Sequence, residues 1–498
     1  MGKIHYARLA PMAKNHDEKK AWDFLVYLAG DNDLSEEMVW SLQEMNQAAL
    51  EPVFHERIGL VALFDPAGGE PVRYDLTARR KRVKNDRGGL SSVGVVDRTL
   101  QRSEEVVQLV ARFLIGAFGE PPRSTNRGVI LSGHGSGALG DFLDDRNPPN
   151  GELGIPTLGR ILRDIRDRSG SGIQILGLDS CQMSTIEVGY EVRDFVRYLV
   201  ASEGPVANTG WPYRQVLQGV AENADAKPVV AARAVANRYL AFYRDYEIAP
   251  QSTDIAVTEL SALGAVAGGV RDLAYALGEP LSRIAAHGLE ELHELDGTTP
   301  APAIADARAI RNAIVLAHWS AQSYKCDRYT DLRDFTEQLL RFLPSEGSLT
   351  EKVRHCSRRL LGTIDTAVML SGATGYDLQH SHGLSIYFPW SSRDYFAEYG
   401  NLQFAKDAGW ADFLGLYIGA TERMRRFQAE RMKDSLAEEP TRVPFTASEP
   451  LAVAGTKDAE AGTRRDAEAG TRRGKLCRST MKNPPDGYYP VTGAPDSQ

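Results

Sequence analysis

Short apolar runs alternate with segments of helical periodicity between residues 22 and 202 of this 498-residue chain, and this alternation constrains the fold most. The apolar runs predict buried strands at 22–29, 58–64, 128–132, 173–179 and 197–202. Helices are expected between them, after residue 35 and over 103–118, 156–168 and 182–194. Strands that alternate with helices in this way favour a mostly parallel α/β sheet that is flanked by helices.

Four segments of different character follow one another along the chain. They are a flexible N-terminal arm, a strand–helix core, a mainly helical second half and a low-complexity tail, with expected bounds of 1–20, 21–225, 226–428 and 429–498. One further strand is expected at 384–388 and a last helix at 410–428. The tail repeats DAEAGTRR in tandem and is rich in Pro and Gly beyond the repeat, which predicts disorder.

Composition argues against several classes of function. The balance of 58 basic against 66 acidic side chains gives a net charge of −8, which argues against a nucleic-acid binder driven by overall charge. No stretch is apolar enough to suggest a membrane span, and the polar N-terminus lacks the apolar core of a signal peptide. The four cysteines are too few for a disulfide scaffold and lack zinc-site spacing, so no structural metal is expected. A reducing cytoplasm is therefore the expected compartment.

The polar stretch GDNDLS at residues 30–35 precedes the first expected helix. Either Ser35 or Asp33 is expected to cap that helix, which would carry Met38, Leu42 and Met45 on one face. The two aspartates of this stretch do not form an EF-hand loop, because the required Gly and Glu are replaced by Glu36 and Leu42.

Two strand ends carry side chains that are able to do chemistry. Strand 128–132 runs into SGHGSG, which places His134 between glycines, and strand 173–179 runs into DSC, which places Cys181 at the start of the next expected helix. If the strands are neighbours, the imidazole and the thiol face each other at one sheet edge. A helix N-terminus and a nearby imidazole both favour the thiolate, and Gly135 and the helix end offer N–H groups for an oxyanion.

Other interpretations of these residues remain open on this reasoning alone. A lone cysteine after a strand is usually a packing residue, and a histidine in a Gly-rich loop is usually structural. The joint placement at two strand ends favours catalysis without settling it. A serine hydrolase is disfavoured, because a G-x-S-x-G motif centred on Ser136 needs glycines where the chain has His134 and Ala138.

Seven ordered segments of the chain resemble clostripain-like cysteine peptidases, which belong to the caspase-like clan. They are VYLAGDNDLSEEM, ILSGHGSGALGDF, GLDSCQMSTIEVGYEVRD, ASEGPVANTGWPY, YTDLRDF, HGLSIYFP and a closing W-x-x-FL, and they cover roughly residues 22–416. The resemblance implies a caspase-like α/β fold. It also implies that His134 is the catalytic base, that Cys181 is the nucleophile, and that the N–H groups of Gly135 and Cys181 form the oxyanion hole.

The resemblance also bears on specificity, since the family typically cleaves after Arg or Lys with acidic groups in its S1 pocket. Asp179 matches one such group and would pair with a basic P1 side chain, although it could also cap the next helix. Some members carry a second acid immediately before a Gly-Trp pair, which corresponds to Gly210 and Trp211 here. This chain has Thr209 at the position of that acid. Asp179, Thr209 and Trp211 are the expected substrate-binding residues. Gln182 stands where an apolar residue is usual.

Several family members are zymogens that are cut in the loop between the catalytic His and Cys. The matching loop here contains FLDDRNPPNGELG, whose composition suits an exposed, cleavable segment. We therefore expect processing after Arg146, within the 144–154 loop. An ordinary surface loop is the alternative. The resemblance leaves open a calcium requirement, for which no residues are assigned, and no other cofactor is expected.

Together these features predict a cysteine endopeptidase that uses a Cys–His dyad and an acyl-enzyme. No third catalytic residue is assigned. The expected partners are protein or peptide substrates and an activating protease or inhibitor, with no nucleic acid and no membrane, and the expected role is that of an intracellular regulatory protease. The alternative is a catalytically silent caspase-like scaffold. A relative with acidic specificity is a second alternative, against which Asp179 argues.

Overall fold

The computed structural model describes residues 20–76, 94–95, 105–120, 122, 124–140, 142–146, 149–245, 252–287, 302–324 and 327–437. Residues 1–19 of the expected arm and residues 438–498 of the expected tail lie outside the described residues. Residues 429–437, which were expected to belong to the tail, instead continue the last helix, which ends at Ala437. The chain divides into two compact units, Met1–Ala420 and Thr421–Gln498. The fold that follows is that of the first unit.

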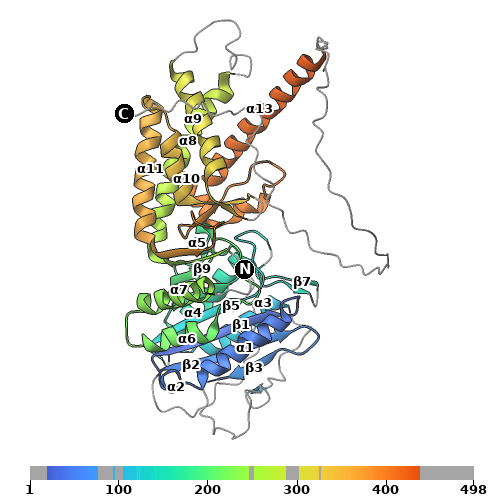
Figure 1. Ribbon diagram of the computed structural model, residues 1–498, viewed down its shortest axis with the longest axis vertical. Coiled ribbons are helices and arrows are strands. Elements are labelled where there is room, and N and C mark those ends of the chain that lie inside the picture. The colour runs from blue at the N-terminus through green and yellow to red at the C-terminus, as the bar shows by residue number, and fades with distance from the viewer. Residues whose placement is uncertain are drawn as a thin grey trace, which may run out of the picture. The chain divides into compact units, whose positions relative to one another are not determined.

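A nine-stranded sheet forms the centre of the fold (Figure 1). In spatial order its strands are β13 (Val368–Thr374), β10 (Thr253–Glu259), β9 (Val196–Ala201), β8 (Ile173–Asp179), β5 (Asn126–Ser132), β1 (Trp22–Gly30), β2 (Ile58–Pro66), β3 (Val72–Asp75) and β4 (Gly94–Val95). The five strands from β9 to β2 are parallel, and the strands beyond them on both sides are antiparallel. The predicted α/β sheet flanked by helices is thus confirmed, but the sheet is mixed: its five central strands are parallel and its edges are antiparallel.

Helices cover both faces of this sheet, which explains why its central strands are almost continuous apolar runs. On one face lie α1 (Ser35–Ala49), α2 (Pro52–Arg57), α6 (Tyr213–Glu222) and α7 (Pro228–Arg244), whose apolar side chains share one core cluster with β1 and β2. On the other lie α3 (Val106–Phe118), α4 (Ile155–Ser169) and α5 (Ile186–Val192). The predicted apolar face of α1 is confirmed, because Met38, Leu42 and Met45 are all buried in that core.

The second half of the chain is less purely helical than its composition suggests. It contributes β10 and β13 to the central sheet, so the sheet extends across the expected boundary at residue 225. It also forms a small antiparallel sheet of β11 (Ser323–Tyr324), β12 (Tyr329–Asp331) and β14 (Ser385–Tyr387). The strand expected at 384–388 is therefore present as β14, but it lies outside the central sheet.

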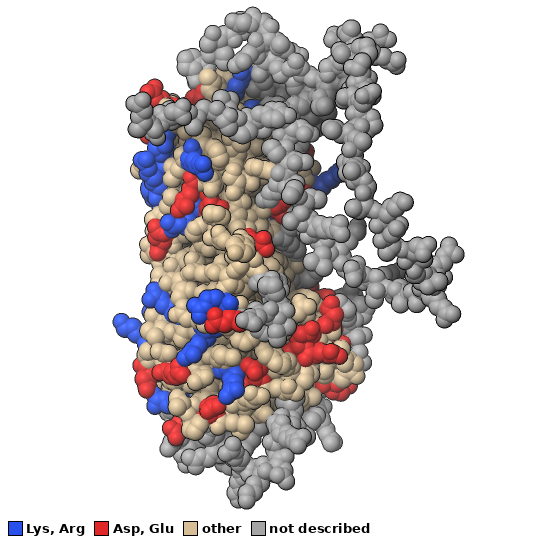
Figure 2. Space-filling view, in the orientation of Figure 1, with Lys and Arg blue, Asp and Glu red and all other residues tan. Residues whose placement is uncertain are grey.

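The remaining elements are mostly helices of this second half. They are η2 (Leu260–Ala262), α8 (Leu263–His287), α9 (Pro302–Ser320), α10 (Leu332–Phe342), α11 (Ser348–Ala367), η5 (Ala397–Asn401), α12 (Gln403–Ala408) and α13 (Trp410–Ala437). Helices α8 to α11 pack against one another (Figure 1). Within the described residues, no helix combines the length and apolarity that a bilayer span needs. Acidic and basic side chains are interspersed over the face in Figure 2.

A buried glutamate joins α5 to the small sheet. Oε1 of Glu187 accepts hydrogen bonds from the backbone N–H of Tyr387 on β14, at 2.9 Å, and from the hydroxyl of Tyr399 on η5, at 3.0 Å. The side chain is completely buried, and burial raises its pKa to about 7 from an ordinary value of 4.5. Glu187 is therefore protonated in the folded protein at mildly acidic pH.

Replacing this glutamate by its neutral isostere should flatten the pH dependence of stability. The folded-state pKa lies above the unfolded value, so the contribution is complete below about pH 4.5 and is lost as the pH rises through about 7. Wild type should lose up to ~3 kcal/mol of unfolding free energy over that range through this group, and Glu187→Gln should not. Urea unfolding at about pH 5 and pH 8 measures the difference. Glu191→Gln, on the same helix, is the control, and a wild-type slope in Glu187→Gln would contradict the assignment.

Candidate active site

The two strands that lead into the candidate catalytic residues are direct neighbours. Strands β5 and β8 pair in parallel, with Ser132 opposite Asp179 as the last matched positions. His134 and Cys181 each lie two residues beyond this pair, so the structure brings them to the same sheet edge as predicted. A small cavity of about 40 Å³ is lined by His134, Cys181 and Asp179 together.

Cys181 does not begin a helix, and this part of the prediction is wrong. Cys181 lies in a turn, and α5 begins only at Ile186, where Oγ1 of Thr185 accepts a hydrogen bond from the N–H of Val188 at 3.1 Å. The helix cannot start at the expected residue because Gln182 has a left-handed φ of 56°. The helix dipole therefore gives no support to a Cys181 thiolate.

The turn after β8 is strained and is held from outside. A left-handed conformation costs a residue such as Gln182 about 1–2 kcal/mol. Its N–H donates to the carbonyl of Gly204 at 3.0 Å, which belongs to the loop after β9. The same loop reaches the thiol, because the N–H of Val206 points at Sγ of Cys181 from 3.3 Å. The thiol in turn donates to the carbonyl of Val206 at 3.7 Å, so Val206 contacts Sγ through both of its backbone groups.

The backbones of the two expected oxyanion donors are in close contact. A Cβ atom on Gly135 would lie 2.5 Å from the carbonyl oxygen and 3.1 Å from the nitrogen of Cys181. No side chain fits there, so glycine is required at this position. The structure thus brings Gly135 and Cys181 together, while their role as N–H donors stays a prediction.

Asp179 forms part of the cavity wall and is almost completely buried. Its Oδ2 accepts hydrogen bonds from the hydroxyls of Ser132, at 2.8 Å, and Tyr213, at 2.9 Å. Its Oδ1 is buried and accepts no hydrogen bond of ordinary geometry within the described residues, although the backbone N–H of Trp211 lies close enough to the carboxyl to lower its pKa. Burial raises the pKa of the carboxyl to about 6, and the hydrogen bonds oppose that shift. A buried acceptor without a partner is costly, so this oxygen is suited to a donor from a ligand.

The other two expected substrate-binding residues do not line this cavity. Thr209 lies beside it, with its hydroxyl 3.0 Å from that of Tyr243, which also donates to the carbonyl of Gly210. Trp211 is fully buried in the core below, where its ring packs on Gly177 of β8. In this conformation, the Trp211 ring supports the wall of the cavity and is not exposed in it.

The structure adds one residue beside His134 that sequence reasoning interpreted differently. Neither Asp33 nor Ser35 caps α1, because Leu34 occupies the N-cap position without a side-chain hydrogen bond. Instead, Oδ1 of Asp33 lies 2.8 Å from Nε2 of His134. The only sequence signal was an acid just beyond β1, the strand next to β5.

The model of the clostripain family matches residues 26–417 of this chain. The chain belongs to the clostripain family. It is therefore a cysteine peptidase, and the resemblance noted in the sequence is confirmed. No curated protein matches the chain.

Solved structures agree with this clostripain-family assignment at the level of fold. A secreted C11 cysteine protease from Bacteroides thetaiotaomicron, in complex with an irreversible peptide inhibitor, has a TM-score of 0.55 at 18% identity, over 78% of this chain and 99% of that one. An inactive zymogen C11 protease from Parabacteroides distasonis has a TM-score of 0.50 at 16% identity, over 79% and 99%.

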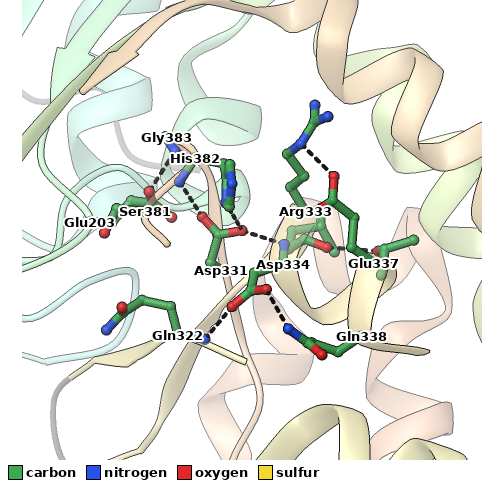
Figure 3. Close-up of polar contacts among 12 residues, drawn as sticks. Glu203, Gln322, Asp331, Arg333, Asp334, Glu337, Gln338, Ser381, His382 and Gly383 are labelled. Atoms are coloured by element: carbon green, nitrogen blue, oxygen red, sulfur yellow. Dashed lines mark hydrogen bonds and ion pairs between the residues drawn. The ribbon is translucent and has the colours of Figure 1, made fainter. Parts of the chain in front are cut away.

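Buried carboxyl groups hold the loop that touches Cys181 in this clostripain-family peptidase. The two oxygens of Asp254 accept the N–H groups of Glu203 and Gly204, each at 2.8 Å. Oε2 of Glu203 accepts the N–H of Gly383 at 2.5 Å, and the carboxylate of Asp331 lies beside it (Figure 3). Burial, with the nearby Asp331 and Asp254 charges, raises the pKa of Glu203 well above its ordinary value. The loop is thus fixed to the second half of the chain.

His382, beside Asp331, is half-buried. Nδ1 of His382 lies 3.3 Å from Oδ1 of Asp331, whose Oδ2 accepts the His382 N–H at 2.5 Å (Figure 3). The hydrogen bond to Asp331 raises the pKa of His382. Among the described residues, no group of three or more His, Cys, Asp or Glu side chains is suited to hold a metal ion.

Adding a methyl group at Gly135 should disable this peptidase without unfolding it globally. A Cβ atom would push the Gly135 backbone away from Cys181 and misplace both expected oxyanion donors. Because one such donor is worth ~100-fold or more in kcat, Gly135→Ala should lower kcat/KM by at least that factor. Gly264→Ala, where a Cβ meets nothing within 4 Å, should keep wild-type activity. Peptide-hydrolysis kinetics measure both, and an active Gly135→Ala enzyme would exclude the proposed close contact.

Proposed function

We propose that this peptidase cleaves peptide bonds after Arg or Lys, with Cys181 as nucleophile and His134 as acid–base. The observation that carries the proposal is the buried carboxylate of Asp179, which shares one cavity with both residues. Its Oδ1 accepts no hydrogen bond of ordinary geometry within the described residues. A guanidinium or ammonium group would supply a charge-assisted hydrogen bond to that oxygen, and a neutral P1 side chain would not.

The reaction follows from the chemistry of these groups. His134 accepts the proton from the Cys181 thiol, and the thiolate attacks the carbonyl carbon of the scissile bond. The N–H groups of Gly135 and Cys181 stabilise the negative charge on the carbonyl oxygen. His134 then protonates the leaving amine, which leaves an acyl-enzyme. A water molecule, deprotonated by His134, hydrolyses the thioester and restores the thiol.

Removing the charge of Asp179 should change specificity more than chemistry. Asp179→Asn should lower kcat/KM for Arg and Lys at P1 by ~100-fold, with little change for a neutral P1 residue. In wild type, the preference for a basic over a neutral P1 residue should rise with pH through about 6, since the carboxyl ionises there. Substrate pairs that differ only at P1 measure both effects. Equal losses on basic and neutral substrates would place Asp179 outside the P1 pocket.

We also propose that the enzyme is made as a zymogen and is activated by cleavage after Arg146. The main chain there is extended: β6 (Asp145–Arg146) pairs with β7 (Pro149–Gly151) in a hairpin. Just before the hairpin, the N–H of Leu143 donates to the carbonyl of His134 at 2.9 Å. A cut in this hairpin therefore lies close to the catalytic base along the chain. A relative with this fold is described as an inactive zymogen, which also supports the proposal.

Mass spectrometry of the purified protein tests this processing. Wild type should be purified as two fragments, or should convert into them, and the first fragment should end at Arg146. Arg146→Gln should remain a single chain with low activity. Cys181→Ala should remain intact if the enzyme cuts itself. A Cys181→Ala protein that is cut at the same bond would show that another protease does the cutting.

We propose the cytoplasmic compartment and the regulatory role from the sequence. Neither Cys181 nor Cys356 is in a disulfide, which suits a reducing cytoplasm. A structural relative is described as secreted, so the compartment needs its own measurement. Cell fractionation, followed by labelling with a thiol-reactive peptide probe, locates the active enzyme. The same labelling tests the scaffold alternative, since a silent scaffold should not react preferentially at Cys181.

A further inference from the structure

The contact between Asp33 and His134 follows from the pairing of two adjacent strands. Strand β1 lies next to β5, with Leu28 opposite Ser132, so the segments after both strands emerge at the same sheet edge. Asp33 follows β1 and His134 follows β5, and their side chains meet with 2.8 Å between Oδ1 and Nε2. A carboxylate can only accept a hydrogen bond, so Nε2 carries a proton and Nδ1 is the nitrogen that accepts one.

We propose that Asp33 is a positioning residue for His134, and that Asn32 holds Asp33 in place. The inference rests on the proposed function, because it assigns the third partner of the same Cys181–His134 pair. A carboxylate on Nε2 keeps the imidazole in the tautomer that accepts the thiol proton, and it stabilises the imidazolium that forms. Asp33 contacts neither the thiol nor the substrate in this scheme and acts only through His134.

The solvent exposure of the Asp33 and His134 side chains determines how large an effect on kcat is expected. The Asp33 side chain is 60% exposed and that of His134 is 37% exposed, so water screens their interaction. A buried aspartate in the comparable position of serine proteases is worth ~10⁴-fold, and an exposed one should be worth less. We expect ~10–100-fold in kcat from Asp33.

Asn32 fixes the loop that presents Asp33. Its side chain is buried, and its amide nitrogen donates to the carbonyls of Ala29, at 3.1 Å, and Asp144, at 2.8 Å. Its amide oxygen accepts the N–H of Leu34 at 2.8 Å. The bonds to Ala29 and Leu34 lie on either side of Asp33 in the sequence, and the bond to Asp144 ties the same loop to a distant segment, so together they restrict where the Asp33 carboxylate can lie.

The same contacts link the catalytic pair to the base of the proposed activation hairpin. Asp144 bonds to Asn32, and the preceding Leu143 bonds to the backbone of His134. Leu143 is buried with a left-handed φ of 54°, a conformation that only its surroundings can maintain. The consecutive residues Leu143 and Asp144 therefore contact the backbone of His134 and the Asn32 side chain that holds Asp33. Arg146 lies two residues after Asp144. This places the proposed cleavage site where it can alter the geometry of the catalytic base.

The test compares Asp33→Asn and Asp33→Glu with Glu36→Gln, which removes an exposed acid three residues away. All assays use the processed enzyme. Asp33→Asn should lower kcat ~10–100-fold with KM unchanged within about twofold, Asp33→Glu should recover part of the loss, and Glu36→Gln should match wild type. Wild-type kinetics in Asp33→Asn, or a loss that lies in KM, would overturn the assignment.

A double-variant cycle tests the role of Asn32. If Asn32 acts through Asp33, Asn32→Ala combined with Asp33→Asn should be no slower than the slower single variant. Multiplicative losses would overturn this part of the proposal. Thermal unfolding midpoints show whether Asn32→Ala remains folded, and Asn32→Asp, which keeps the Leu34 contact, is the alternative if it does not.

A second readout separates this proposal from the proposed function. The alkylation rate of Cys181 by iodoacetamide depends on the thiolate, not on peptide recognition. Asp33→Asn should slow that reaction ~3–10-fold relative to Glu36→Gln. If wild type cleaves no peptide, the proposed function fails, and the alkylation rates still decide whether Asp33 acts on His134. Equal rates in the two variants would reject the Asp33 assignment.

Discussion

The parallel pairing of β5 with β8 is the interaction on which the rest of the site depends. It places Ser132 opposite Asp179, and a 2.8 Å hydrogen bond between their side chains closes the end of the pair. Beyond this pair, the segment after β5 continues to His134, and the segment after β8 continues to Cys181. A shift of one residue in the register would turn these side chains to the opposite face of the sheet, so the register itself determines the active site.

Beyond that pair, loops and not helices complete the site. The turn at Gln182 is strained, and the loop after β9 supplies both the carbonyl that holds it and the N–H that points at the thiol. That loop is fixed in turn by Glu203 and Asp254, two buried acids with raised pKa values. Strain in the turn after β8 is therefore maintained by buried polar contacts with the second half of the chain.

Sequence periodicity located the central strands, because a strand covered on both faces has to be apolar throughout, as β1 and β2 are. It missed β10, which lies within an Ala-rich region whose composition favours helix. It placed the helix start too early at Cys181, because a left-handed residue such as Gln182 has no signature in composition. The sequence predicted Asp33 as a helix cap, because an aspartate carboxylate can accept a hydrogen bond either from a helix N-terminus or from an imidazole.

The sequence by itself determined the fold class and the pair of strand ends that carry Cys181, His134 and Asp179, since local apolar patterns and residue types are sufficient to indicate these. Only the tertiary structure decided which groups surround that pair. Asp33 reaches His134 across 101 positions, and Glu203 reaches Gly383 across 180. Such contacts depend on strand order and on loop paths in space, which no local pattern of residues encodes.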